Sequence, residues 1–258
     1  MVKSDIKPFK MHENIYFVGS TRVSVHIIDT EDGLVMIDTG YPDMYEQILD
    51  SMKELGLDPK KICAIFHSHG HIDHFGCTQK LKNLSGAKTY ISYIDNDIVN
   101  GKLDLSWAKE IGYERLSPFN CDVLIKDGDV FTFGSTSIRC VLTPGHTEGV
   151  LSFFINVKKK DCEFTAAMHG GVGFNTLSSK FLNEYKLSFD CREIFRKSLH
   201  KVFEERVDIA LGNHPGQNDT EGKLQKVLEG KSILDGSEWK QFLIDTEQRL
   251  DEQIANGF

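Results

Sequence analysis

The chain has 258 residues, of which 40% are hydrophobic and 26% are charged, and its formal net charge is −8. These values predict a soluble globular protein of one large domain or two small ones. The acidic balance argues against nucleic acid as a partner, because such binding usually needs a basic surface. No apolar run is long enough to cross a membrane, and Met1–Lys10 lacks the apolar segment of an export signal. We therefore expect a cytoplasmic protein, and six scattered cysteines without a CxxC motif fit a reducing compartment.

The first half of the chain alternates predicted strands with predicted helices. Short apolar runs bounded by turn residues predict strands, and Met44, Ile48, Met52 and Leu55 fall at helical spacing. The predicted strands are Ile15–Val18, Val23–Ile28, Gly33–Asp38, Ile62–Phe66 and Lys88–Ser92. The predicted helices are Pro42–Leu55, Gly76–Leu84 and Ile94–Gly101.

The second half begins with an irregular segment, Lys102–Cys121, for which a lid and a dimer contact both stay open. The strands predicted after it are Val123–Ile125, Val130–Phe133, Ser137–Leu142, Val150–Val157, Cys162–Met168 and Val207–Leu211. The predicted helices are Phe189–Phe203 and Trp239–Ile254. Because the strands come in two groups, each followed by helices, we expect two sheets packed face to face with helices outside.

The densest group of metal-ligand residue types follows the predicted strand Ile62–Phe66. It consists of His69, His71, Asp73 and His74. Imidazole and carboxylate are the ligands that zinc and related divalent ions take in proteins. Strand ends that run into loops are also where α/β folds place their sites. The segment therefore predicts a metal-dependent enzyme.

Two further histidines stand at predicted strand ends. His146 follows the strand Ser137–Leu142 through a Pro-Gly turn, which predicts a tight bend that presents the histidine. His214 follows the strand Val207–Leu211 directly. We expect both to join the first group as metal ligands.

These motifs together resemble the metallo-β-lactamase superfamily. The pattern H-x-H-x-D-H at 69–74, P-G-H-T at 144–147 and the later His214 carry the resemblance, and Ile37–Gly40 is similar to an early Asp-Thr-Gly turn of that superfamily. The likeness spans roughly residues 12 to 220 and implies an α+β fold, an αββα sandwich of two packed mixed sheets. It implies a single domain over residues 1–258. Within the superfamily, Met44–Gly101 looks most similar to the third subclass of class B β-lactamases.

The resemblance implies two zinc ions, although iron, manganese and nickel accept the same ligand types. It assigns one ion to His69, His71 and His146. It assigns the second to Asp73, His74 and His214, and Asp73, the candidate catalytic residue, would also orient the attacking hydroxide.

Two residues near the expected ligands keep alternative interpretations. Asp38 either hydrogen-bonds a ligand histidine or loop amides, or only caps a turn. His169 ends the predicted strand Cys162–Met168, where many hydrolases of this superfamily place a metal-bridging aspartate and the resembled subclass places serines. This chain has no acid there, so substrate contact by His169 and a plain loop role both stay open. His12, His26 and His200 are interpreted as structural or surface residues, and His67 as a packing histidine, with support of the ligand residues as its alternative.

The sequence thus predicts a zinc-dependent hydrolase in which a metal-bound hydroxide attacks a small ester, lactone or amide, as in a β-lactamase. The partner would be a small molecule, and neither nucleic acid nor membrane. One alternative is a phosphodiesterase or nuclease, which would need a basic groove. The other is a non-hydrolytic di-iron redox protein of the same fold, which would need added carboxylate ligands. The substrate and the oligomeric state are not determined by the sequence.

Overall fold

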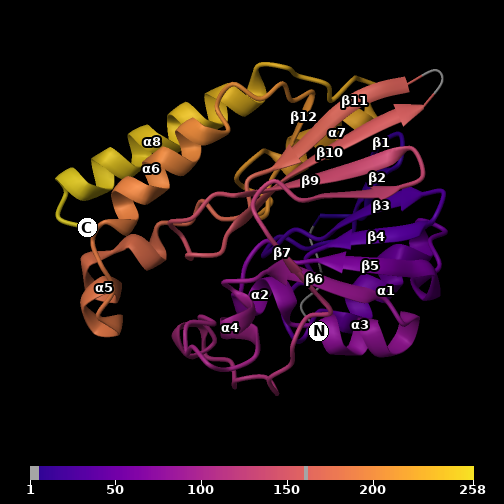
Figure 1. Cartoon of the computed structure of the whole chain (residues 1–258). Coiled ribbons are helices and arrows are strands. Elements are labelled where there is room, and N and C mark those ends of the chain that lie inside the picture. The colour runs from indigo at the N-terminus through magenta and orange to yellow at the C-terminus, as the bar shows by residue number, and fades with distance from the viewer. Residues whose placement is uncertain (1–5, 160–161) are drawn as a thin grey trace.

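The computed structural model describes residues 6–159 and 162–258. Residues 1–5, part of the segment inspected for an export signal, and residues 160–161, part of a predicted turn, lie outside the described residues. The described strands form a seven-stranded sheet in the order β1 to β7 and a five-stranded sheet in the order β12-β11-β10-β9-β8 (Figure 1).

Both sheets are mixed. The first contains β1 (Phe9–His12), β2 (Ile15–Phe17), β3 (His26–Thr30), β4 (Gly33–Ile37), β5 (Ile62–Phe66), β6 (Lys88–Ser92) and β7 (Val123–Ile125). Its strands pair antiparallel from β1 to β4 and parallel from β4 to β7. The second contains β8 (Val130–Phe133), β9 (Thr136–Leu142), β10 (Leu151–Lys159), β11 (Cys162–Met168) and β12 (Ile209–Leu211). Here only the β11–β12 pair is parallel.

The helices lie outside the two sheets. In Figure 1, α1 and α3 lie beside the first sheet, whereas α6 and α8 lie along the second. The described α-helices are α1 (Tyr45–Glu54), α2 (Ile72–Phe75), α3 (Thr78–Ser85), α4 (Asn96–Val99), α5 (Ser179–Tyr185), α6 (Cys191–Lys201), α7 (Thr220–Leu228) and α8 (Glu238–Ala255). No helix within the described residues combines the length and apolar content of a membrane span.

Alternation along the strands explains why the molecule has layers, because successive side chains of a strand point to opposite faces. On β10, Phe153 and Ile155 pack in the core between the sheets, whereas Phe154 packs with α6 and α8. On β4, Val35 lies in the core between the sheets and Met36 in the core beneath α1 and α3. Each sheet thus buries both faces, which gives the predicted αββα sandwich.

Most predicted elements are present, with shifted ends. The strand predicted at Val23–Ile28 begins only at His26 in β3. Val23 and Val25 lie in the preceding turn, where their carbonyls accept hydrogen bonds from Ser20 N and Val18 N. The elements β1, α2, α5 and α7 were not predicted, and α2 lies where a loop was expected. Segment 102–121 is irregular, as predicted, apart from one 3₁₀ turn at Lys109–Ile111.

Candidate metal centre

The expected ligands come from the segments that follow strands β5, β9 and β12, and two of them, Asp73 and His74, lie in the short helix α2. One backbone hydrogen bond joins the first two loops, because Leu151 N at the start of β10 donates to Ser68 O after β5 at 2.8 Å. A second joins the third loop to the turn before β3, because Ser24 N donates to Asn213 O at 3.0 Å. These bonds bring the ends of both sheets together, so residues far apart in sequence meet at one edge.

The structure gathers the six expected ligands into two neighbouring groups of three. In the first group, His69, His71 and His146 have ring centroids 4.6 to 4.8 Å apart. In the second group, Asp73 Oδ2 lies 3.5 Å from His74 Nε2 and 3.6 Å from His214 Nε2. Within each group the candidate ligand atoms lie within 4.8 Å of one another. The His69 and His74 rings, 4.2 Å apart, connect the two groups.

The protein holds the far nitrogen of three histidines, which fixes how each ring faces the centre. His74 Nδ1 lies 2.7 Å from Asp38 Oδ2, His146 Nδ1 lies 2.8 Å from Gly173 O, and His214 Nδ1 lies 2.8 Å from Arg22 O. In metal sites such partners orient the ligand histidine and set its tautomer. His74 Nε2 is buried and has no hydrogen-bond partner among the described residues. This donor set therefore fits a divalent cation.

Asp38 supports the second group from the end of β4. Its carboxylate accepts hydrogen bonds from Ser68 N at 2.7 Å and Ser68 Oγ at 2.8 Å, besides its contact with His74. Its φ of 58° lies in the left-handed region, which is uncommon for a residue with a side chain. Of the two interpretations of Asp38, the geometry favours the one in which it orients a ligand histidine.

Burial keeps most of these imidazoles neutral, the form that can bind a metal. Burial and the neighbouring histidines hold the pKa of His69 and of His71 well below its usual value. Burial lowers the pKa of His146 to about 4. Burial also acts to lower the pKa of His74, but the carboxylates of Asp73 and Asp38 outweigh it and the net pKa is raised.

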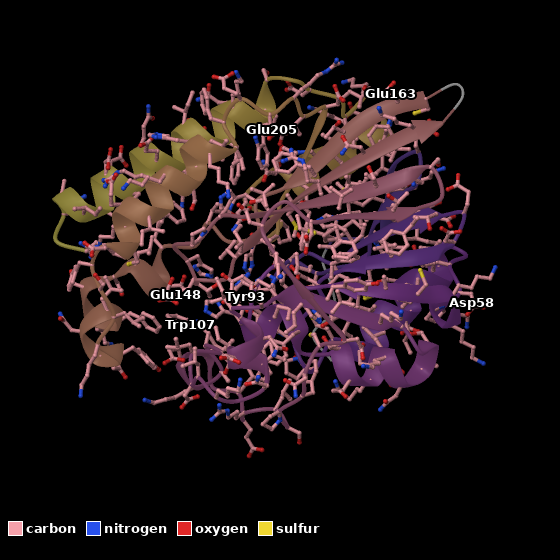
Figure 2. All side chains as sticks on the ribbon, viewed as in Figure 1. Asp58, Tyr93, Trp107, Glu148, Glu163 and Glu205 are labelled. Carbon is pink, nitrogen blue, oxygen red and sulfur yellow. The ribbon has the colours of Figure 1, made fainter. Side chains whose placement is uncertain are left out.

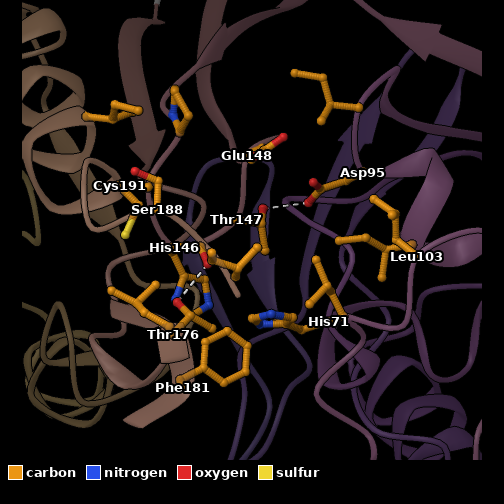
Figure 3. Close-up of a pocket in the computed structure, with 18 residues that line it drawn as sticks. His71, Asp95, Leu103, His146, Thr147, Glu148, Thr176, Phe181, Ser188 and Cys191 are labelled. Atoms are coloured by element: carbon orange, nitrogen blue, oxygen red, sulfur yellow. Dashed lines mark hydrogen bonds between the residues drawn. The ribbon is translucent and has the colours of Figure 1, made fainter. Parts of the chain in front are cut away.

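Asp95, which the sequence analysis missed, connects two of the histidine loops. It follows β6, is 1% exposed, and accepts hydrogen bonds from Gly70 N at 2.8 Å, Gly149 N at 2.9 Å and Thr147 Oγ1 at 2.6 Å. Figure 3 shows the last of these contacts. Burial raises the pKa of Asp95 to about 6. Asp95 follows β6, which pairs parallel with β5, and this position at a strand end is the signal that could have revealed it.

His169 is buried and stands apart from both groups. Gly171 N donates to its Nδ1 at 3.4 Å, and its ring centroid lies 6.3 Å from that of Phe195. This position favours the loop role over substrate contact. The following glycines let the loop approach His146, since a Cβ on Gly171 would lie 2.9 Å from the His146 ring.

The remaining histidines do not belong to the two groups, although His67 lies near His74. Buried His67 contacts Thr78 Oγ1 at 3.3 Å, and buried His26 contacts Gly212 O at 3.1 Å. The ring of His12 lies against Phe164, and exposed His200 pairs with Glu247.

Segment 102–121 contributes to the site through Trp107. This residue lines a cavity of about 260 Å³ together with Asp73, His74, His146 and His214. Its ring centroid lies 5.9 Å from that of His71. Figure 2 shows Trp107 on the side of the molecule toward α5, at the opposite end from Glu163. The segment therefore forms part of the cavity wall.

Comparison with known proteins agrees with this architecture. The family model described as the metallo-beta-lactamase superfamily matches residues 18–159, more than half of the chain. An uncharacterized protein of Aquifex aeolicus is 30% identical over 173 residues, which are 66% of this chain and 78% of that protein. A hydroxyacylglutathione hydrolase of Francisella philomiragia is 22% identical over 202 residues, 76% of this chain and 70% of that protein.

The fold also resembles a solved structure, that of BJP-1, a subclass B3 metallo-beta-lactamase of Bradyrhizobium japonicum. The TM-score is 0.86 at 24% identity, and the match covers 98% of this chain and 96% of that one. This likeness confirms the predicted fold. The chain is therefore a hydrolase that belongs to the metallo-beta-lactamase superfamily.

Proposed function

We propose that the protein is a zinc-dependent hydrolase of small carboxylic esters, lactones or amides. The observation that carries the proposal is the pair of ligand groups at one edge of the sandwich. His69, His71 and His146 would hold one zinc ion. The second zinc ion would be held by Asp73, His74 and His214. When bound, two such ions polarise a carbonyl oxygen and lower the pKa of a water molecule.

The residues around the ligands would position the reactants. Asp73 lines the cavity with its carboxylate, which can accept a hydrogen bond from the attacking water and orient it. Tyr41 lines the same cavity, and burial raises its pKa to about 12. Its hydroxyl therefore keeps its proton at neutral pH and can donate a hydrogen bond to the substrate.

The charges around the site support a carbonyl substrate over a phosphodiester. Among the described residues that line the cavity at the ligands, none is lysine or arginine. Phosphodiester substrates are usually bound by such cations. The hydrolase name of the Francisella relative also supports a carbonyl substrate. At the end of β11 the sequence Ala-Met-His offers no additional carboxylate, which disfavours the di-iron alternative.

A metal analysis and a substrate panel test the proposal. Purified protein should bind about two zinc ions by elemental analysis, as two-metal hydrolases do. The zinc-loaded protein is then assayed with an aryl ester, a lactone, a β-lactam and an aryl phosphodiester. We expect turnover of a carbonyl substrate that a chelator abolishes and added zinc restores. Absence of bound metal, or turnover of the phosphodiester alone, would contradict the proposal.

A further inference from the structure

A second cavity lies next to the candidate metal centre. His71 and His146 border both cavities, so the two spaces meet at the first ligand group. The second cavity has a volume of about 520 Å³, within the size range of small-molecule pockets. In Figure 3, His71, His146 and Phe181 lie close together, and Leu103 lies on the side opposite Cys191.

The walls of this cavity are mainly apolar and come from segments far apart in the sequence. They include residues of α4, segment 102–121, α5, α6 and the loop between the last two. Six of them are Ile98, Leu105, Phe181, Leu182, Leu187 and Ile194. Three of these, Ile98, Phe181 and Leu182, are less than 10% exposed. These three residues form the buried part of an apolar wall.

The carboxylates on the lining of this cavity are negative, and no lysine or arginine among the described lining residues could pair with an anion. Asp95 and Glu148 are the acidic residues on its lining. Asp95 is occupied by its three hydrogen bonds, and Glu148 is exposed to solvent. A carboxylate or phosphate placed among the apolar walls, away from His71 and His146, would lose its hydration without gaining a charged partner.

We propose that this cavity binds the uncharged hydrocarbon chain of the substrate, so the enzyme prefers neutral esters of medium-chain acids. The inference rests on the proposed function. An acyl chain in this cavity would leave the scissile carbonyl beside His71 and His146, because these residues border both cavities. Each buried methylene should tighten binding by roughly three- to fourfold until the cavity is full.

Trp107 allows a binding test that does not depend on turnover. Its ring centroid lies 5.1 Å from that of Phe181, which lines the cavity. The chain has two tryptophans, and Trp239 is buried against Phe154 in another core. A bromine-labelled octyl alcohol should therefore quench the fluorescence of the zinc-loaded protein saturably. Quenching should be lost in Trp107→Phe, and saturable quenching that persists in this variant would contradict the proposed location.

A matched pair of variants separates the cavity from the rest of the surface. Ile194 lines the cavity and is 41% exposed, whereas Leu234 lies outside both cavities and is 47% exposed. Ile194→Glu should weaken binding of the bromo-octyl probe about tenfold, because it replaces an apolar wall residue with a charge beside the chain. Leu234→Glu should leave binding unchanged. Equal effects of the two substitutions would overturn the proposal.

Turnover then distinguishes this inference from the proposed function. In a series of aryl esters from acetate to octanoate, kcat/KM should rise with chain length, and Ile194→Glu should lower the octanoate-to-acetate ratio about tenfold. If the probe binds but no ester, lactone or amide is hydrolysed, the proposed function fails while the cavity assignment stands. If esters are hydrolysed without chain-length preference and the probe does not quench, the cavity assignment fails alone.

Discussion

At the scale of single residues, Asp38 holds the candidate ligand His74 in a fixed orientation. We predict that Asp38→Asn weakens zinc binding at the second ligand group about 10- to 100-fold, because the charge that orients His74 Nδ1 is lost. The first group should keep its affinity. Titration against a chelating dye measures the zinc affinity of both sites. The matched control is Asp50→Asn, which removes an exposed carboxylate on α1. Two ions bound with unchanged affinity would show that Asp38 has no such role.

Asp95 supports a second prediction, about the two loops that it connects. An asparagine can accept with only one oxygen, so Asp95→Asn should leave at least one of the donors Gly70 N, Gly149 N and Thr147 Oγ1 unpaired. We expect the free energy of unfolding to fall by about 1 to 3 kcal/mol. Urea unfolding is the measurement. Asp97→Asn removes a half-exposed carboxylate two residues away and serves as control; equal losses in both variants would refute the role of Asp95.

The candidate ligands were predictable from sequence, and the contact of Asp38 with a ligand histidine was one of two alternatives, whereas the role of Asp95 was not predicted. His69, His71, Asp73 and His74 fall within six residues, so residue type and spacing reveal them without a structure. Asp95, in contrast, acts on residues 25 to 54 positions away, and no motif marks it beyond its position after the strand β6. Such contacts arise only when the fold brings loops from both sheets together at one edge of the sandwich.

At the scale of elements, the strands were predicted more completely than the short helices. Strands such as β5 and β10 are buried on both faces and stand out as apolar runs. Helix α5 has seven residues, of which only Phe181 and Leu182 are buried, so its apolar pattern is too short to recognise. Helices of this length depend on tertiary packing rather than on local preference. The cavity wall that α5 provides was therefore not predictable either.

The cap of α5 gives a prediction at this scale. Ser178 Oγ accepts a hydrogen bond from Phe181 N at the first turn of the helix. Ser178→Ala should destabilise α5 locally by about 0.5 to 2 kcal/mol, whereas Ser178→Thr, which keeps a capping hydroxyl, should cost less. Hydrogen exchange of the α5 amides is the measurement, with zinc content as a reference that stays constant. Identical exchange in both variants would rule out a contribution of this cap.

At the scale of the whole molecule, buried His26 makes stability depend on pH. It lies on β3 in the first sheet and contacts Gly212 O after β12 of the second sheet at 3.1 Å. Burial lowers its pKa to about 4, although the contact with Gly212 acts in the opposite direction. The unfolded chain has the ordinary pKa of 6.5 and so binds the proton more readily than the folded protein. The stabilisation is therefore complete above pH 6.5 and is lost as the pH falls toward 4.

Between about pH 7 and pH 5 this histidine alone should reduce the free energy of unfolding by about 2 kcal/mol. His26→Gln keeps a donor for Gly212 O and removes the titrating imidazole. Its free energy of unfolding should therefore fall by about 2 kcal/mol less than that of the original protein between pH 7 and pH 5. Urea unfolding in the presence of a chelator excludes the effect of zinc release from the ligand histidines. His200→Gln, at an exposed position, should retain the pH dependence of the original protein. If His26→Gln retains it too, the acid sensitivity originates elsewhere, in the ligand histidines or His67.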